Sequence, residues 1–242
     1  MAGKLARNLA LLGVALVGAE AAYAVLRPAP RLPEFDPSGE FGDPSHPTLK
    51  IAVLGDSSVT APGVSGPDEV WIRIAARRLA GAGRHVVLSS FAVGGSKAVD
   101  VRNGQLQAAL EFRPDIAVVS VGANDAIRWV PVKRFEEDLD ALVTALRGFG
   151  SRVMLTGVGD LGTIPRLYEP LRSLMTARSL LYHRAHERVA ARHECVVAEH
   201  RNDDRELWLR DRSLWAEDLF HVSARGHARW AEYAMRALEP LA

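Results

Sequence analysis

Four short polar segments of this 242-residue chain carry side chains that could perform chemistry. In chain order they are Gly55-Asp56-Ser57-Ser58, Gly94-Gly95-Ser96, Gly122-Ala123-Asn124-Asp125 and Asp218-Leu219-Phe220-His221. Taken singly, each segment is ordinary turn or helix-capping sequence. Together they supply a serine, a histidine and an aspartate, which are the residue types of a nucleophile, a general base and an orienting acid.

Ser57 is the candidate nucleophile of this set. A serine hydroxyl attacks poorly until a base removes its proton. His221 is the candidate base, because an imidazole can take and return a proton near neutral pH. Asp218 precedes it by three positions, so its carboxylate can bond one ring nitrogen and fix the tautomer.

Attack by a serine on an ester carbonyl creates an oxyanion that preorganised donors must stabilise. The predicted donors are the backbone N–H groups of Ser57 and Gly95 and the side-chain amide of Asn124. Glycine at position 95 permits a close backbone approach to the substrate. Asp56 is interpreted as a structural hydrogen-bonding residue and not as a second catalytic acid.

Short apolar runs alternate with helical periodicity over residues 49–242, which are predicted to form one folded domain. Five runs have the length and β-branched content of strands, at 51–54, 86–93, 116–121, 153–155 and 195–198. Apolar strands between helices indicate a parallel sheet that is covered on both faces. The predicted fold is a three-layer α/β/α sandwich with a doubly wound five-stranded parallel sheet in the order 2-1-3-4-5. In such sheets ligands bind at the carboxyl ends of the strands, where the polar segments fall.

The four segments resemble the sequence blocks of the SGNH hydrolases, the GDSL esterase/lipase superfamily, over about residues 50–242. The chain departs from the usual blocks at Ser58, where Leu is common, at Ser90, where Asn often stands, and at Val222, where Pro is commoner. The resemblance implies an SGNH/flavodoxin-like fold and a carboxylic ester hydrolase that works through an acyl-enzyme. It implies no cofactor and no metal.

Several activities remain open for the same residues. A serine esterase, lipase or lysophospholipase acting on a small-molecule or lipid ester is the leading interpretation. An acyltransferase or a carbohydrate O-deacetylase would use the same set, and a catalytically silent binding module would keep only the fold. Trp129 is a candidate for lining an acyl pocket or for the core, His227 is expected at the solvent or in packing, and residues 160–168 are a candidate wall or lid of the site.

Residues 1–26 are predicted to carry the chain into or across a membrane. Lys4 and Arg7 precede a largely apolar stretch that is long enough to span a bilayer, although Glu20 interrupts it. One interpretation is an uncleaved single-pass anchor with the catalytic domain outside the cytoplasm. The other is a signal peptide that is cut after Ala24, which would release a secreted protein.

Composition limits the remaining possibilities. Residues 27–48 contain six of the 13 prolines and are predicted to form an extended linker. The net charge is only +1, which argues against a nucleic-acid partner. Cys195 is the single cysteine, so an internal disulfide and a multi-cysteine metal site are both excluded.

Overall fold

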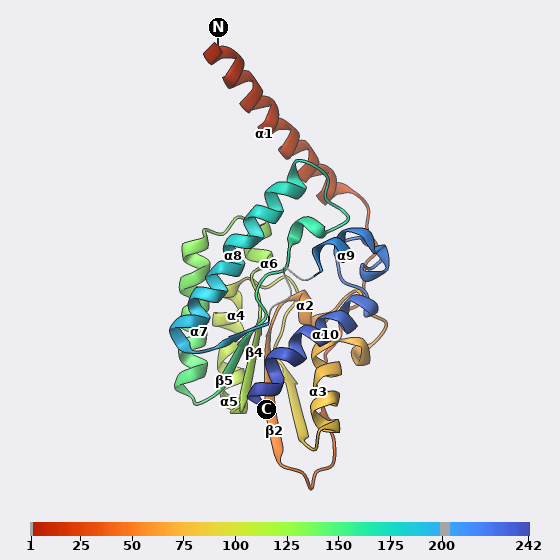
Figure 1. Cartoon of the computed structure of the whole chain (residues 1–242), viewed down its shortest axis with the longest axis vertical. Helices are drawn as coiled ribbons and strands as arrows, with labels where there is room; N and C mark the ends of the chain where they lie inside the picture. Colours follow the sequence, from red (N-terminus) through yellow and green to blue (C-terminus); the bar gives the residue numbers. More distant parts are fainter. Residues whose placement is uncertain (1, 199–203) are drawn as a thin grey trace.

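The computed structural model describes residues 2–198 and 204–242, and its centre is a six-stranded sheet with the order β1-β3-β2-β4-β5-β6 (Figure 1). Strands β2 to β6 pair in parallel, and β1 runs antiparallel to β3 at the edge. The strands are β1 (Gly39–Phe41), β2 (Thr48–Gly55), β3 (His85–Ser90), β4 (Ile116–Ser120), β5 (Arg152–Leu155) and β6 (Val196–Val197).

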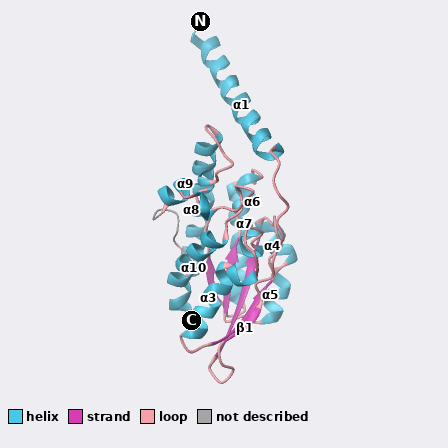
Figure 2. Ribbon diagram, turned by 90° about the vertical axis from the view of Figure 1, so that its right-hand side faces the viewer, coloured by secondary structure: helices cyan, strands magenta, loops and turns pink. Residues whose placement is uncertain are grey.

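Helices cover both faces of this sheet. Helices α3 and α10 pack on one face, and α4, α5, α7 and α8 pack on the other (Figures 1 and 2). The helices are α1 (Ala2–Leu26), α2 (Ser57–Thr60), α3 (Trp71–Gly81), α4 (Ala98–Gly104), α5 (Leu106–Phe112), α6 (Ala123–Ile127), α7 (Val132–Gly148), α8 (Leu171–His193), α9 (Arg205–Arg210) and α10 (Ala224–Leu238). The predicted three-layer α/β/α architecture is confirmed.

Strand β2 shows why the sheet needs two helix layers. Ile51 and Val53 join the apolar cluster under α3 and α10, whereas Ala52 and Leu54 join the cluster on the opposite face. All four side chains are completely buried. Since successive side chains of a strand point to opposite faces, a strand between two helix layers has to be apolar at every position. The continuous apolar run in the sequence is therefore the pattern of a central strand.

The five predicted strands correspond to β2–β6, and their predicted order is confirmed. The sixth strand, β1, lies in the proline-rich segment that was expected to be an extended linker. Phe35 and Phe41 of this segment pack against the cluster under α3 and α10, and the Phe35 N–H donates to the Thr60 carbonyl (2.8 Å). Burial of two aromatic side chains offsets the entropy of ordering a short segment. The linker interpretation therefore does not hold for residues 35–41.

Helix α1 projects from the domain, with its C-terminal end against the loop before α8 (Figure 1). The Glu20 carboxylate accepts hydrogen bonds from the backbone N–H groups of Leu171 (2.9 Å) and Tyr168, and Val17 and Ala21 pack on the apolar cluster of that loop. Among residues 2–198 and 204–242, no helix has the combined length and apolarity needed to cross a membrane. The single-pass anchor expected in this segment is thus not found, and signal-peptide cleavage stays a prediction.

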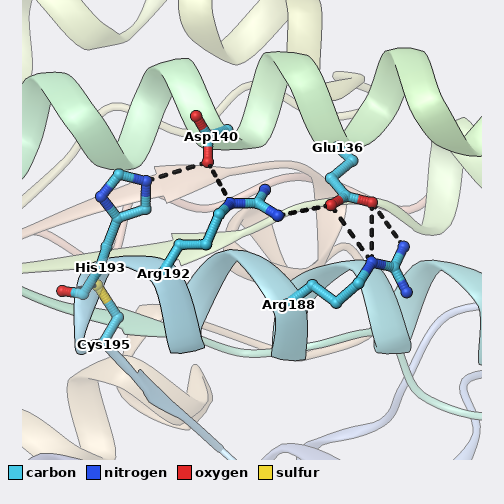
Figure 3. A network of polar contacts seen from close by, with 6 residues as sticks. All are labelled: Glu136, Asp140, Arg188, Arg192, His193 and Cys195. Carbon is cyan, nitrogen blue, oxygen red and sulfur yellow. Dashed lines mark hydrogen bonds and ion pairs between the residues drawn. The ribbon is translucent and has the colours of Figure 1, made fainter.

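Helices α7 and α8 are joined on their exposed side by a network of ion pairs (Figure 3). Arg188 and Arg192 both bind Glu136, while Arg192 and His193 bind Asp140 at 3.0 Å. Each exposed pair adds at most ~1 kcal/mol, but the shared partners fix how the two helices lie against each other. The network lies on the outer helices, away from the strand ends that carry the candidate site.

Candidate active site

The candidate nucleophile begins the short helix that follows β2. Asp56 caps this helix, with its Oδ1 accepting a hydrogen bond from the Ser58 N–H (2.9 Å), and Ser57 is its first residue. A positive φ at Ala61 ends the helix after a single turn. The Ser57 hydroxyl has no hydrogen-bond partner among the described residues and lines a cavity, so it is available to a substrate.

His221 and Asp218 form the expected pair. The Asp218 Oδ2 lies 2.6 Å from His221 Nδ1, and its Oδ1 accepts from the backbone N–H groups of Phe220 and His221, both at 2.9 Å. Burial by itself raises the pKa of Asp218, but the hydrogen bonds from His221 and the two N–H groups outweigh it and hold that pKa below its ordinary value. An anionic Asp218 keeps the proton of a neutral imidazole on Nδ1 and leaves the Nε2 lone pair to act as a base.

The loop that carries this pair is tightly held. Trp215 and Val222 form an antiparallel bridge, and between them the Ala216 N–H donates to the His221 carbonyl (2.8 Å). Leu219 has a φ of +59°, a conformation that costs a non-glycine residue about 1–3 kcal/mol and persists only where the surroundings impose it. The chain thereby folds back so that the three-residue spacing brings carboxylate and imidazole together.

Arg166 supports this loop from outside and is 7% exposed. Its guanidinium donates to the Asp218 carbonyl (3.0 Å), and its backbone N–H donates to the Leu219 carbonyl (3.2 Å). The same guanidinium donates to the carbonyls of Ala24 (2.6 Å) and Arg27 at the end of α1. One buried side chain therefore connects the candidate catalytic loop with the N-terminal helix, and no sequence pattern indicates this link.

The predicted oxyanion donor Asn124 lies in the first turn of α6, which follows β4. Its Nδ2 donates to the Asp56 Oδ2 (3.0 Å), so the amide is oriented by the carboxylate that also caps the Ser57 helix. Gly122 permits the turn between β4 and α6, because its φ is +118° and a Cβ there would lie 2.8 Å from Val158 Cγ2. Asn124 and Ser57 line the same cavity as His221.

Gly95 lies in the turn after β3 with a φ of +76°, a conformation that favours glycine. It is not among the residues that line the cavity, so its place as a donor remains a prediction. Gln105, which sequence reasoning missed, fastens this turn to β2. Its amide exchanges two hydrogen bonds with the Gly55 backbone (2.8 and 2.9 Å) and donates to the Ser96 hydroxyl (3.2 Å). A single glutamine at the turn between α4 and α5 carries no pattern that would have identified it.

Two further carboxylates are buried beneath the site. Burial raises the pKa of Asp56 above its ordinary value, although Ser58 and Asn124 donate hydrogen bonds to it. Asp125 accepts from the Ala98 N–H (3.0 Å), and burial raises its pKa to about 6. The interpretation of Asp56 as a structural residue agrees with these contacts.

The cavity beside Ser57 has a volume of about 190 Å³. Residues 160–164 of the expected wall contribute Asp160, Leu161, Thr163 and Ile164 to it.

Trp129 is not part of the lining and is 55% exposed, so neither the acyl-pocket nor the core interpretation holds for it. His227 was expected at the solvent or in packing, and it is 1% exposed and lines the cavity. Four of the five tryptophans surround this space, namely Trp71, Trp208, Trp215 and Trp230.

Among residues 2–198 and 204–242, no group of histidine, cysteine, aspartate and glutamate side chains could hold a metal ion. Cys195 lies beside the α7–α8 network, half-buried, and burial raises the pKa of its thiol (Figure 3). A thiol with a raised pKa is a poor nucleophile, and Cys195 does not line the cavity beside Ser57.

Comparison with known proteins decides the family. The model of the GDSL-like lipase/acylhydrolase family matches residues 53–229. The chain belongs to this family. A GDSL-like esterase of Mycobacterium tuberculosis is 33% identical over 140 residues, which cover 57% of this chain and 44% of that protein. The chain thus matches less than half the length of this curated relative.

Several solved structures have a similar fold. The structure of TesA has a TM-score of 0.68 and 22% identity with this chain, and the alignment covers 80% of this chain and 100% of the TesA chain. The esterase EstA from Pseudoalteromonas sp. has a TM-score of 0.64 and 20% identity, covering 79% and 97% of the two chains. A catalytic mutant of Axe2, an acetylxylan esterase from Geobacillus stearothermophilus, also has a TM-score of 0.64, with 16% identity over 78% and 94%. At these identities the likeness concerns the fold.

Proposed function

We propose that this GDSL-family chain hydrolyses carboxylic esters through an acyl-enzyme on Ser57, with His221 as the base and Asp218 as its orienting acid. The observation that carries the proposal is the 2.6 Å contact between Asp218 Oδ2 and His221 Nδ1. It fixes the tautomer that leaves Nε2 unprotonated on a histidine that lines the same cavity as Ser57.

In the first step the Ser57 Oγ attacks the ester carbonyl while its proton passes to His221 Nε2. The new Oγ–C bond gives a tetrahedral oxyanion, which accepts hydrogen bonds from the Ser57 N–H and the Asn124 amide, with the Gly95 N–H as the third predicted donor. Collapse of this intermediate breaks the bond to the alcohol oxygen, and His221 returns the proton to that oxygen. Asp218 stabilises the transient imidazolium.

In the second step water replaces the departed alcohol. His221 takes a proton from the water as its oxygen attacks the acyl carbon, and the same donors bind the second oxyanion. Release of the Ser57 oxygen, which takes the proton back from His221, yields the free carboxylic acid. The reaction consumes one water and needs no redox partner or cofactor.

The test is hydrolysis of p-nitrophenyl butyrate by the full chain, together with covalent labelling by a fluorophosphonate. We expect Ser57→Ala to lower kcat by on the order of 10⁴-fold or more and to abolish labelling. Ser58→Ala is the matched control, because the hydroxyl of this neighbouring serine bonds the Ser120 hydroxyl (2.7 Å) and has no role in the proposed mechanism. Labelling that persists in Ser57→Ala and disappears in Ser58→Ala would contradict the assignment.

A further inference from the structure

The cavity beside Ser57 is walled mainly by aromatic and aliphatic side chains from the layer that contains α10. Trp208 and Trp215 meet edge to face with ring centroids 5.4 Å apart, and Trp230 of α10 lies 6.2 Å from Trp208. Tyr233 and Ala234 continue the wall along α10. These residues converge from α9, from the loop with the His–Asp pair and from α10, so the space extends from the candidate nucleophile along an apolar surface.

Two of the four tryptophans around the cavity donate their indole N–H to the backbone. The Trp71 Nε1–H donates to the Ser58 carbonyl (2.8 Å), and the Trp215 Nε1–H donates to the Trp208 carbonyl (3.0 Å). Buried indole N–H groups need a partner, and these two have theirs within the wall. No hydrogen bond from these two indoles is therefore left for a ligand, and the rings can offer only carbon surface.

Two titratable groups of the lining, His227 and Arg205, do not place an unpaired charge inside the cavity. His227 accepts a long hydrogen bond from the Trp71 N–H (3.4 Å) and contacts the Trp230 ring, and burial lowers its pKa to about 3, so it is neutral at pH 7. Arg205 is paired with Asp160 at 2.8 Å. With His227 neutral and Arg205 paired, the part of the cavity that the tryptophans line favours a hydrocarbon ligand over a charged head group.

We propose that this tryptophan-walled cavity binds the acyl chain of the ester and that it sets a chain-length optimum of about six to eight carbon atoms. This inference rests on the proposed function of Ser57. The volume of about 190 Å³ exceeds the ~150 Å³ of an apolar protein cavity that accepts benzene, so it has room for roughly this number of carbons.

The acyl half of the ester suits this cavity better than the alcohol half. The acyl group remains bonded to Ser57 through the covalent intermediate, whereas the alcohol has to leave before water can enter. A pocket that encloses hydrocarbon beside the nucleophile therefore retains the group that stays. Each methylene that enters adds ~0.8 kcal/mol of transfer free energy, which is about fourfold in kcat/KM.

The experiment measures kcat/KM of the full chain for p-nitrophenyl esters from acetate to palmitate and for acetate esters of alcohols of the same lengths. We expect about a fourfold rise per methylene in the acyl series up to about C6–C8, then a plateau or decline, and a much flatter alcohol series. A steeper rise in the alcohol series, or a flat acyl series with turnover that depends on Ser57, overturns the acyl assignment alone. Absence of turnover and of fluorophosphonate labelling overturns the proposed function itself.

Two variants test the walls directly. Trp230→Ala enlarges the cavity from a half-buried position and should move the optimum to longer chains by two or more carbons, while Ala234→Leu fills it and should move the optimum towards acetate. Trp129→Ala is the matched control, since that tryptophan is exposed and lies outside the lining. An optimum that stays in place in Trp230→Ala, with a thermal midpoint equal to that of the parent, would exclude this cavity as the acyl site.

Discussion

Asp56 at the nucleophile and Asp218 in the histidine loop are both almost inaccessible to solvent, at 2% and 6% exposure, but their surroundings differ. Asp56 accepts hydrogen bonds from neutral groups, the Ser58 N–H and the Asn124 amide, and burial raises its pKa. Asp218 accepts from the imidazole of His221 and from two backbone N–H groups, which together lower its pKa in spite of burial.

The two aspartates have chemically identical side chains, but their surroundings suit them to different roles. The region around Asp218 favours a negative charge beside His221, the imidazole that becomes cationic in the proposed reaction. The region around Asp56 is arranged to orient an amide and a helix, for which an oxygen acceptor matters more than a charge. Burial alone therefore does not identify a catalytic carboxylate, and the donors that face it do.

The largest expected effect concerns Asp218→Asn. An amide at this position can donate to Nδ1 and so favour the wrong tautomer of His221, and we expect kcat for p-nitrophenyl butyrate to fall by about 10⁴-fold. Circular dichroism of the variant checks that the loop remains folded. A loss below about tenfold would break the comparison, because the charge at Asp218 would then be dispensable.

A smaller effect is expected from Asp56→Asn. The asparagine retains one oxygen that can accept from the Ser58 N–H, but it orients the Asn124 amide less well. We therefore expect kcat to fall by about tenfold or less, which corresponds to the free energy of about one hydrogen bond. Fluorophosphonate labelling should be slower but complete. If Asp56→Asn and Asp218→Asn lose activity equally, the two carboxylates are not functionally distinct.

The third prediction concerns stability and the variant Asp125→Asn. The folded pKa of Asp125 is about 6, above the unfolded value of 3.8, so the folded state binds the extra proton and the parent loses stability as pH rises from about 4 to about 6. Relative to the parent, the variant should gain roughly 2–3 kcal/mol over that range. Urea unfolding at pH 4, 5, 6 and 7 measures this difference. Asp218→Asn should change in the opposite direction, because the folded pKa of Asp218 is lowered.

The sequence was sufficient for the order of the parallel strands and for the segments of the site, because both depend on local patterns. Apolar runs identify central strands, and the serine and the Asp-x-x-His segment lie at strand or helix ends. For His227 the packing alternative holds, and it could have been preferred to the solvent one, since this residue shares a helical face with Ala231 and Ala234 through spacings of four and three residues. Strand β1 was missed because three residues in a proline-rich stretch show no strand periodicity.

The remaining features depend on contacts between distant parts of the chain. Gln105 lies 50 residues from the Gly55 backbone that it holds, and nothing near either residue indicates the pairing. Trp71, Trp208 and Trp230 are likewise far apart in the sequence and converge only when α3, α9 and α10 are in place. The sequence shows that the tryptophans are present, but their common position around one cavity follows only from the packing of the helices.

The contacts of Arg166 connect cleavage of the N-terminal helix with the support of the histidine loop. A signal peptidase acting after Ala24 would remove one of the carbonyls that bind the guanidinium, while the Arg27 and Asp218 carbonyls would remain. The same cut would release the Glu20 carboxylate that holds the loop before α8. Processing of the chain would therefore remove part of the support behind the histidine loop, and a trimmed form would hold that loop through fewer contacts than an untrimmed one.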